Sequence, residues 1–282
     1  MSPTEKYNRI PTSKKPKNPQ EFFRLILGCA YKVSSRTEDK DMAYTNVFAR
    51  YEIKYLIDKD QKDRLVKAME GRMKEDYYGH TTIRNIYFDT PDQRLIRTSL
   101  DKPEYKEKLR VRSYKRVTED EDIFVELKKK FEDVVYKRRT AMPEHLASRW
   151  LCEGGRAPYD TQIVNEIAYL MEFYKTLEPK VFLSYERDAY LAKDQSGLRI
   201  TFDSNIIARD HDLTLTKNVY GDKVIPQDQY VLEIKVSGGM PLWLTEFLTG
   251  NRLQKTSFSK YGAYYINNIR KEQTNKGGLL YA

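Results

Sequence analysis

The chain contains few of the residues that build disulfide frameworks and histidine-based metal centres. Its 282 residues include two cysteines and three histidines. Cys29 and Cys152 cannot form a disulfide framework or a cysteine-rich zinc site, and this cysteine usage fits a cytoplasmic protein. Any metal ion is therefore expected on carboxylate and phosphate oxygens, which favours Mn²⁺ or Mg²⁺ as the cofactor.

Long apolar runs are also missing. No stretch of about 18 apolar residues occurs, so we expect no membrane segment in this chain. Hydrophobic residues still make up 40% of the sequence and aromatic residues 12%. This content is enough to bury a sizeable core, which excludes wholesale disorder. The length allows either two domains or one large β domain.

The two ends of the chain differ from its middle. Residues 1–20 are rich in proline and lysine and almost devoid of apolar side chains. We expect a disordered tail or extension over 1–44, one folded domain over 45–272 and a C-terminal tail over 273–282. A second interpretation of the first segment is that the native protein starts at Met42, near the point where the folded pattern begins.

The middle of the chain shows strand-like alternation interrupted by helical patterns. We expect eight strands, at 47–57, 81–91, 105–116, 122–131, 133–142, 181–192, 198–206 and 230–238. Apolar residues at helical spacing predict helices at 59–76, 143–152, 160–176 and 241–249. The predicted class is α+β, built on an antiparallel eight-stranded sheet or barrel with helices packed outside.

Within these strands the charged residues fall on one face and the apolar residues on the other. The charged faces, together with a lysine near the C-terminus, hold fourteen basic residues: Arg50, Lys54, Lys106, Lys108, Arg110, Arg112, Lys128, Lys130, Lys137, Arg139, Arg187, Arg199, Lys235 and Lys260. They hold four acidic residues: Glu52, Glu126, Asp203 and Glu233.

This charge pattern has two interpretations. The wet face of any antiparallel sheet carries Lys and Glu, so each strand alone is unremarkable in its charge. The whole set is unusual, because an ordinary solvent face mixes charges of both signs. If the sheet closes into a barrel with helices at 59–76, 160–176 and 241–249 outside, these residues line a tunnel suited to a linear chain of phosphates.

The order of these segments resembles the triphosphate tunnel metalloenzymes, and within them the polyphosphate polymerase domain of the vacuolar transporter chaperone (VTC) family. The resemblance covers about residues 47–270. The segments that carry it are RYEIKYLI (50–57), NIYFDTPD (85–92), KLRVRSY (108–114), IFVELKKK (123–130), VVYKRR (134–139), SYERDAY (184–190), LRITFD (198–203), VLEIKV (231–236) and SFSKYG (257–262).

The resemblance implies the activity and the residues that perform it. The chain is expected to transfer the terminal phosphate of ATP to a growing inorganic polyphosphate. The residues implied to grip the triphosphate and spread its developing charge are Lys54, Arg110, Arg112, Lys128 and Lys137. Those implied to bind the acceptor chain or the leaving side are Arg187, Arg199, Lys235, Ser259 and Lys260. The implied metal ligands are Glu233 and Glu126.

The chain departs from the wider superfamily at one position. Hydrolase and cyclase members open with E-x-E-x-K, whereas here Arg50 precedes Glu52 and Lys54. This substitution favours the polymerase branch but leaves the role of Glu52 open. The sensing domain and membrane helices of the eukaryotic proteins have no counterpart in the pattern, so we expect a stand-alone, prokaryote-type member.

Three alternatives remain at this stage. A metal-dependent triphosphatase of the same fold would use water as the acceptor, and a non-catalytic module would bind polyphosphate without turnover. Nucleic-acid binding is weaker, because the 22 tyrosines follow strands and helices as packing residues and predict no stacking platform beside the basic faces.

Asp89, in the DTP turn at 89–91, is interpreted as a turn residue rather than a catalytic aspartate.

Overall fold

The computed structural model describes residues 51–131, 134–194 and 196–271. The tails predicted at 1–44 and 273–282, and Arg50, lie outside these residues. The strands are β1 (Tyr51–Asp58), β2 (Met73–Asp89), β3 (Tyr105–Ser113), β4 (Asp122–Phe131), β5 (Val134–Pro143), β6 (Glu178–Ala192), β7 (Arg199–Arg209), β8 (Asp222–Lys223), β9 (Gln229–Val236) and β10 (Lys255–Thr256). The helices are α2 (Lys59–Met69), α3 (Arg94–Leu100), α4 (Glu144–Cys152), α5 (Gln162–Tyr174), α6 (Leu242–Gly250), α7 (Lys260–Tyr264) and the π-helical turn η2 (Tyr265–Ile269).

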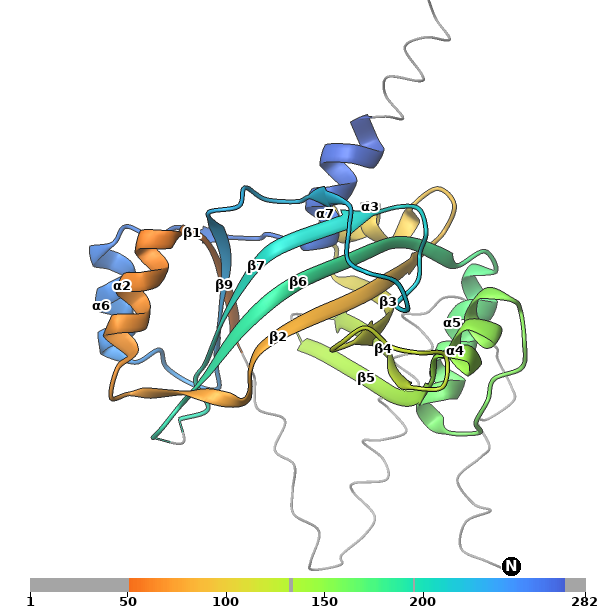
Figure 1. The fold of residues 1–282 in the computed structure, drawn as a ribbon, viewed down its shortest axis with the longest axis horizontal. Coiled ribbons are helices and arrows are strands. Elements are labelled where there is room, and N and C mark those ends of the chain that lie inside the picture. Colours follow the sequence, from red (N-terminus) through yellow and green to blue (C-terminus); the bar gives the residue numbers. More distant parts are fainter. Residues whose placement is uncertain (1–50, 132–133, 195, 272–282) are drawn as a thin grey trace, which may run out of the picture.

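All the described strands join one antiparallel sheet, shown in Figure 1. Its order is β10-β1-β9-β7-β6-β2-β3-β4-β5, with β8 paired to β7. The α+β class and the eight predicted strands are confirmed, but the eight-stranded closed barrel is wrong. The sheet has ten strands, because β8 and β10 are two-residue pieces too short to show a period. In the described chain no backbone pairing joins β5 to the β10–β1 edge, so the sheet stays open.

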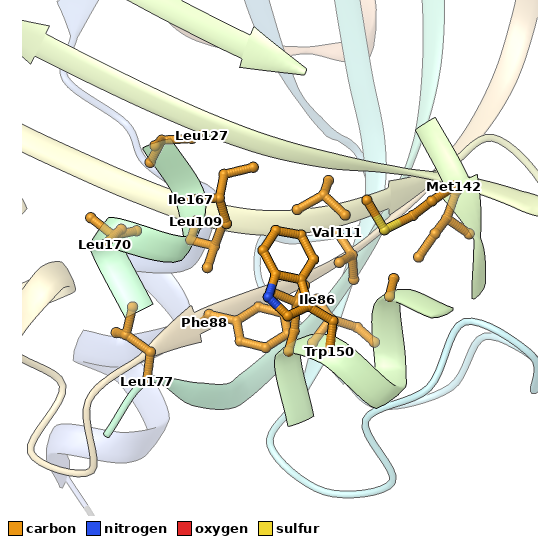
Figure 2. Packing of buried hydrophobic residues seen from close by; sticks show 14 of the residues in the cluster. Ile86, Phe88, Leu109, Val111, Leu127, Met142, Trp150, Ile167, Leu170 and Leu177 are labelled. Carbon is orange, nitrogen blue, oxygen red and sulfur yellow. The ribbon is translucent and has the colours of Figure 1, made fainter. Parts of the chain in front are cut away.

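Helices cover the apolar face of the sheet, as the amphipathic patterns predicted. α4 and α5 bury Trp150 and Ile167 against Leu109 and Leu127 of β3 and β4, a packing that Figure 2 shows closely. α2 and α6 bury their apolar side chains against β1, β7 and β9. The apolar faces of β1, β3, β4 and β9 therefore turn toward these helices and their charged faces lie on the opposite side, whereas β2, β6 and β7 also bury apolar residues against α3, α7 and η2.

The helix predicted over 59–76 is shorter than expected. α2 starts with a capping box between Asp58 and Gln61 and ends at Met69. Gly71 follows with a φ of +76°, a left-handed conformation that glycine adopts without a side-chain clash. The chain then turns into β2 at Met73, so β2 begins eight residues before the strand predicted at 81.

Helix α3 was not predicted, and Asp89 explains why it forms. The buried Asp89 carboxylate accepts hydrogen bonds from the backbone N–H groups of Thr90, Leu95 and Ile96 at 2.8, 2.7 and 2.9 Å. It also accepts one from the Tyr261 hydroxyl at 3.1 Å. Asp89 therefore has the structural role at a turn that the sequence predicted, and it ties β2 to α3 and α7.

In the part of the chain that the structure describes, no helix combines the length and the apolar character needed to cross a membrane.

Candidate phosphate-binding site

The face of the sheet opposite α2, α4, α5 and α6, here called the charged face, carries the predicted site residues. Their strand neighbours, such as Leu109 and Ile234, are fully buried in the clusters beneath the helices. Strand alternation therefore turns the predicted residues the other way. Ten of them lie on strands: Lys54, Arg110, Arg112, Glu126, Lys128, Lys137, Arg187, Arg199, Glu233 and Lys235. The other two start α7, where Ser259 is the N-cap and Lys260 the first residue.

Glu233 on β9 is surrounded by cations. Its carboxylate lies 3.4 Å from the Lys54 ammonium, 3.3 Å from that of Lys235, 3.6 Å from the Arg187 guanidinium and 3.9 Å from the Lys260 ammonium. Burial alone would raise the pKa of Glu233, but these four cations hold it well below its usual range. Glu233 is therefore ionised and ties together side chains from four elements.

Asp203 on β7 forms a second centre beside the first. Arg187 donates two parallel hydrogen bonds to its carboxylate, at 2.6 and 2.7 Å, and Lys260 also contacts it. Burial opposes ionisation here too, yet Lys260 and Arg187 lower the pKa of Asp203. The paired geometry fixes the Arg187 plane, as bidentate arginine–carboxylate contacts do.

Glu126 on β4 forms a separate centre with a different set of cations. Arg110, directly opposite on β3, lies 2.7 Å from its carboxylate, Lys137 lies 2.8 Å away and Arg112 lies 3.7 Å away. Only 1% of the Glu126 side chain is exposed. Burial would raise its pKa, but the three cations lower it to about 2.

Neutral side chains hold the two arginines of β3 in place. Arg110 donates to the Tyr87 hydroxyl at 2.9 Å, and Arg112 donates to the Asn85 side-chain oxygen at 2.9 Å and to the Tyr185 hydroxyl at 3.3 Å. Both guanidinium groups are thereby oriented before any ligand arrives, which lowers the entropic cost of binding one.

Three lysines lie directly opposite one another across β3, β4 and β5. Lys128 pairs in register with Lys108 on one side and with Lys137 on the other. Lys137 contacts Glu126, and Lys108 donates a hydrogen bond to the Ser259 hydroxyl at 3.3 Å but forms no ion pair with a described residue. Lys128 has no hydrogen bond or ion pair with any residue that the structure describes. Like charges placed opposite each other destabilise a sheet, so this row is under electrostatic strain without an anion.

The pKa values of two of these lysines reflect that strain. Burial lowers the pKa of Lys108 to about 8, and the nearby cations Lys128, Lys106 and Lys54 add to the effect. Burial also lowers the pKa of Lys128, with Lys54 and Arg110 acting in the same direction. Each of these groups gains stability when an anion binds beside it.

The predicted metal ligands do not form one cluster. Glu126 contacts Arg110, Arg112 and Lys137, whereas Glu233 contacts cations from β1, β6, β9 and α7. Two carboxylates accompany Glu233. Lys54 links it to Glu52 at 3.1 and 3.4 Å, and it shares Arg187 and Lys260 with Asp203. Burial and Glu233 both raise the pKa of Glu52, although Lys128, Lys54 and Lys235 outweigh them. No group of three or more potential ligand residues is found among the described residues.

The two ends of the charged face differ. At one end α7 and η2 pack onto it, with Tyr261 stacked on Tyr87 at 5.2 Å and the Ser259 hydroxyl beside Lys108. At the other end Arg199 donates to Asp76 at 2.8 Å. Lys108 therefore lies near the end covered by α7, and Arg199 marks the opposite end.

Aromatic side chains gather at the Arg199 end, contrary to the prediction that no stacking platform lies beside the basic face. Tyr78 is nearly parallel to Tyr114, with ring centroids 6.5 Å apart. Tyr114 meets Phe124 edge-on, and Arg139 lies over the Phe124 ring. The prediction failed because a break in the β2–β6 register turns this part of β2 outward, which strand periodicity does not show.

Several residues of the site were missed or left without a role. Asp203 and Glu52 were predicted only as acidic residues of the charged face, and Asn85, Tyr87 and Tyr185 were not predicted as site residues. The alternation of Asn85 and Tyr87 with the buried Ile86 and Phe88 is the signal that could have placed them opposite Arg112 and Arg110. Their hydrogen bonds become visible only when the registers of β2, β3 and β6 are known.

Comparisons with known proteins place the chain in a family. The family model for the VTC domain matches residues 49–266. A search of curated proteins finds no match.

Three solved structures are similar to the chain at low sequence identity. A candidate adenylate cyclase from Bacillus halodurans is 16% identical, with 79% of this chain and 98% of that chain covered and a TM-score of 0.47. A candidate adenylyl cyclase from Hippeastrum with a dominant triphosphatase activity is 14% identical, with 76% and 95% covered and a TM-score of 0.41. A Pyrococcus horikoshii protein is 12% identical, with 79% and 99% covered and a TM-score of 0.39.

Proposed function

Because the chain belongs to the VTC domain family, we propose that it is a polyphosphate polymerase that transfers the terminal phosphate of ATP to a growing inorganic polyphosphate. The observation that carries this proposal is the row formed by Lys108, Lys128 and Lys137. Two of its members, Lys108 and Lys128, form no hydrogen bond or ion pair with an acidic residue that the structure describes, and all three face the same side. A chain of phosphates laid along the row would neutralise it and supply direct anionic partners.

The proposed reaction needs little from the protein beyond position and charge. A terminal phosphate oxygen of the acceptor attacks the γ-phosphorus of ATP, the bond from that phosphorus to the β–γ bridging oxygen breaks, and ADP leaves. The acceptor phosphate is largely ionised near neutral pH, with a second pKa of about 6, so no side chain has to remove a proton. None of the proposed phosphate ligands is a histidine, which agrees with a reaction that needs no general base.

The arginines are suited to the phosphoryl group in transit. Arg110 and Arg112 are fixed by Glu126, Tyr87, Asn85 and Tyr185, so they present oriented donors to charge that develops in the transition state. The proposed grip on the triphosphate adds Lys54, Lys128 and Lys137. Arg187, Arg199, Lys235, Ser259 and Lys260 are proposed to bind the acceptor chain or the leaving group.

A divalent cation fits the carboxylates that the structure brings together. Glu52 and Glu233 lie on either side of Lys54, and their hard oxygens are the ligand type that Mn²⁺ and Mg²⁺ prefer. A bound cation would neutralise phosphate oxygens during transfer. We therefore propose Glu52 in place of Glu126 as the companion of Glu233, with Glu126 acting as the counter-ion that positions Arg110.

A product assay tests the proposal. The purified protein is incubated with ATP and Mn²⁺, and the products are separated on a gel stained for polyphosphate while free phosphate is measured. We expect a nuclease-resistant, phosphatase-sensitive ladder that is lost in Arg110→Ala. Arg97→Ala, which changes an exposed arginine of α3 that pairs with Asp92, is the matched control.

The same assay separates the alternatives. Free phosphate without a ladder would contradict the polymerase and support a triphosphatase. Tight polyphosphate binding without either product would support a non-catalytic binding module.

A further inference from the structure

Two tyrosines stand out of the sheet at the Arg199 end of the charged face. Tyr77 is 94% exposed and Tyr78 is 73% exposed, although both lie within β2. Large aromatic side chains left in water carry an unsatisfied apolar face, and adjacent exposed rings often mark a binding site. Nothing in the proposed phosphate chemistry uses them.

A hydrogen-bonded turn within β2 holds these tyrosines away from the sheet. Between Glu75 and His80 the pairing of β2 with β6 shifts register, so the intervening residues leave the ladder. Asp76 stabilises the turn by accepting hydrogen bonds from the backbone N–H groups of Tyr78 and Gly79, at 2.9 and 3.1 Å. The other Asp76 oxygen accepts from Arg199 at 2.8 Å. The turn is thereby anchored to a cation of the charged face.

The exposed rings continue into the charged face. Tyr78 and Tyr114 are inclined by only 10°, with centroids 6.5 Å apart, and Tyr114 meets Phe124 at 5.8 Å. The Arg139 guanidinium lies 3.5 Å from the Phe124 ring centroid. The rings therefore form one connected aromatic strip, here called the aromatic rim, made of Tyr77, Tyr78, Tyr114 and Phe124.

The aromatic rim follows directly on the proposed triphosphate grip. Tyr114 is two residues beyond Arg112 on the chain leaving β3, and Phe124 is two residues before Glu126 on β4. Within β4 this spacing spans about 7 Å and keeps Phe124 on the face of Glu126. Tyr114 lies just beyond the end of β3 and is placed by its contact with Phe124. A ligand whose phosphates reach Arg112 would therefore have its other end beside these rings.

We propose that Tyr78 and Tyr114 form a stacking site for the base of a nucleoside triphosphate, whose phosphates extend inward to Arg112 and Arg110. This inference rests on the proposed function and adds to it the end at which the donor binds. Purine and pyrimidine bases both stack on aromatic side chains. The site would therefore bind a nucleoside without selecting one base. Arg139 and Arg199, at the two sides of the rim, favour a ligand that is negatively charged.

Binding measurements on two ligands test the proposal. Titration calorimetry compares ATP with inorganic tripolyphosphate, which has the same charged chain and no base. In Tyr78→Ala and Tyr114→Ala we expect the Kd for ATP to rise about tenfold, with the Kd for tripolyphosphate unchanged. Tyr78→Phe keeps the ring and should restore ATP binding. Tyr159→Ala, an exposed tyrosine outside the rim, should bind both ligands as the wild type does.

The outcomes distinguish the stacking site from the phosphate site. Equal weakening of both ligands in Tyr78→Ala, or no weakening of ATP, would overturn the stacking site while leaving the proposed function intact. A wild-type protein that binds neither ligand would overturn the proposed function itself. A 5′-triphosphorylated oligonucleotide could also bind more tightly than ATP, with Tyr78 needed for the oligonucleotide and not for ATP. That result would identify the ligand of the rim as an RNA 5′ end and would overturn the mononucleotide site.

Discussion

Glu52 on β1 and Lys128 on β4 interact electrostatically, although five strands lie between β1 and β4 in the order of the sheet. Burial is the largest influence on the pKa of each, and each also favours the charged form of the other. The open sheet therefore curls until side chains from distant strands interact. Electrostatic contact across the concave side takes the place of the backbone closure that a barrel would have.

Removing the Lys128 side chain should lower turnover without lowering the free energy of unfolding. Lys128→Ala deletes a cation whose burial and repulsion by Lys54 and Arg110 together outweigh its attraction to Glu52 and Glu233, so we expect the free energy of unfolding to stay the same or rise slightly. Turnover should fall by about 10²–10³-fold, as when one charge-stabilising donor is removed from an active site. Urea unfolding and the polyphosphate gel measure the two effects. Wild-type turnover in Lys128→Ala would contradict the proposed site.

Truncating a core residue on the helix-covered face of the same sheet should lower the free energy of unfolding without lowering the activity of the folded protein. Leu109 is fully buried against α4 and α5 and is flanked in sequence by Lys108 and Arg110. Leu109→Ala should lower the free energy of unfolding by about 2–5 kcal/mol, with activity kept while the protein is folded. Urea denaturation with a parallel activity assay checks this. A loss smaller than about 1 kcal/mol would show that this face is poorly packed.

Phosphate binding should weaken as the pH rises through 8. Burial and the nearby cations lower the pKa of Lys108 to about 8, so Lys108 is protonated below that pH and neutral above it. Burial opposes ionisation of Tyr87, but Arg110, Arg112 and Lys108 lower its pKa to about 8 as well, and an ionised Tyr87 would repel an anion. Both changes therefore act in the same direction.

Calorimetry of tripolyphosphate binding in buffers of different ionisation enthalpy measures this effect. We expect proton uptake on binding near pH 8, since the ligand raises the pKa of Lys108. Lys108→Arg should remove the lysine contribution, and Tyr87→Phe the tyrosine contribution. Proton uptake that is unchanged in both variants would assign the effect to other groups.

The three carboxylates should differ in their effect on metal activation. Glu52→Gln and Glu233→Gln should raise the Mn²⁺ concentration needed for half-maximal activity, because both are proposed ligands. Glu126→Gln should leave that concentration unchanged. It should instead lower the free energy of unfolding by about 3–5 kcal/mol, since it removes the buried partner of Arg110. A shift in Mn²⁺ activation for Glu126→Gln alone would restore it as a metal ligand.

The sequence by itself determined which residues face the site. The period of two in β3, β4 and β9 separates Leu109, Val125 and Ile234 from their charged neighbours, and every predicted site residue on a strand lies on the predicted face. This succeeded because a strand has only two faces and burial selects one of them. The helices that cover the apolar face were visible for the same reason, since their apolar stripes recur at helical spacing.

Tertiary structure alone decided which of those residues meet. Glu126 and Glu233 share a pattern in sequence, yet strand order assigns them to different cations and places Glu52 beside Glu233. The curl of the sheet brings β1 opposite β4, and the break in β2 at Asp76 turns Tyr78 toward Tyr114. These features depend on strand order, register and twist. Long-range pairing sets the order and the register, and the twist becomes a curl only when it accumulates over many paired strands, so the local periodicity of one strand does not show these features.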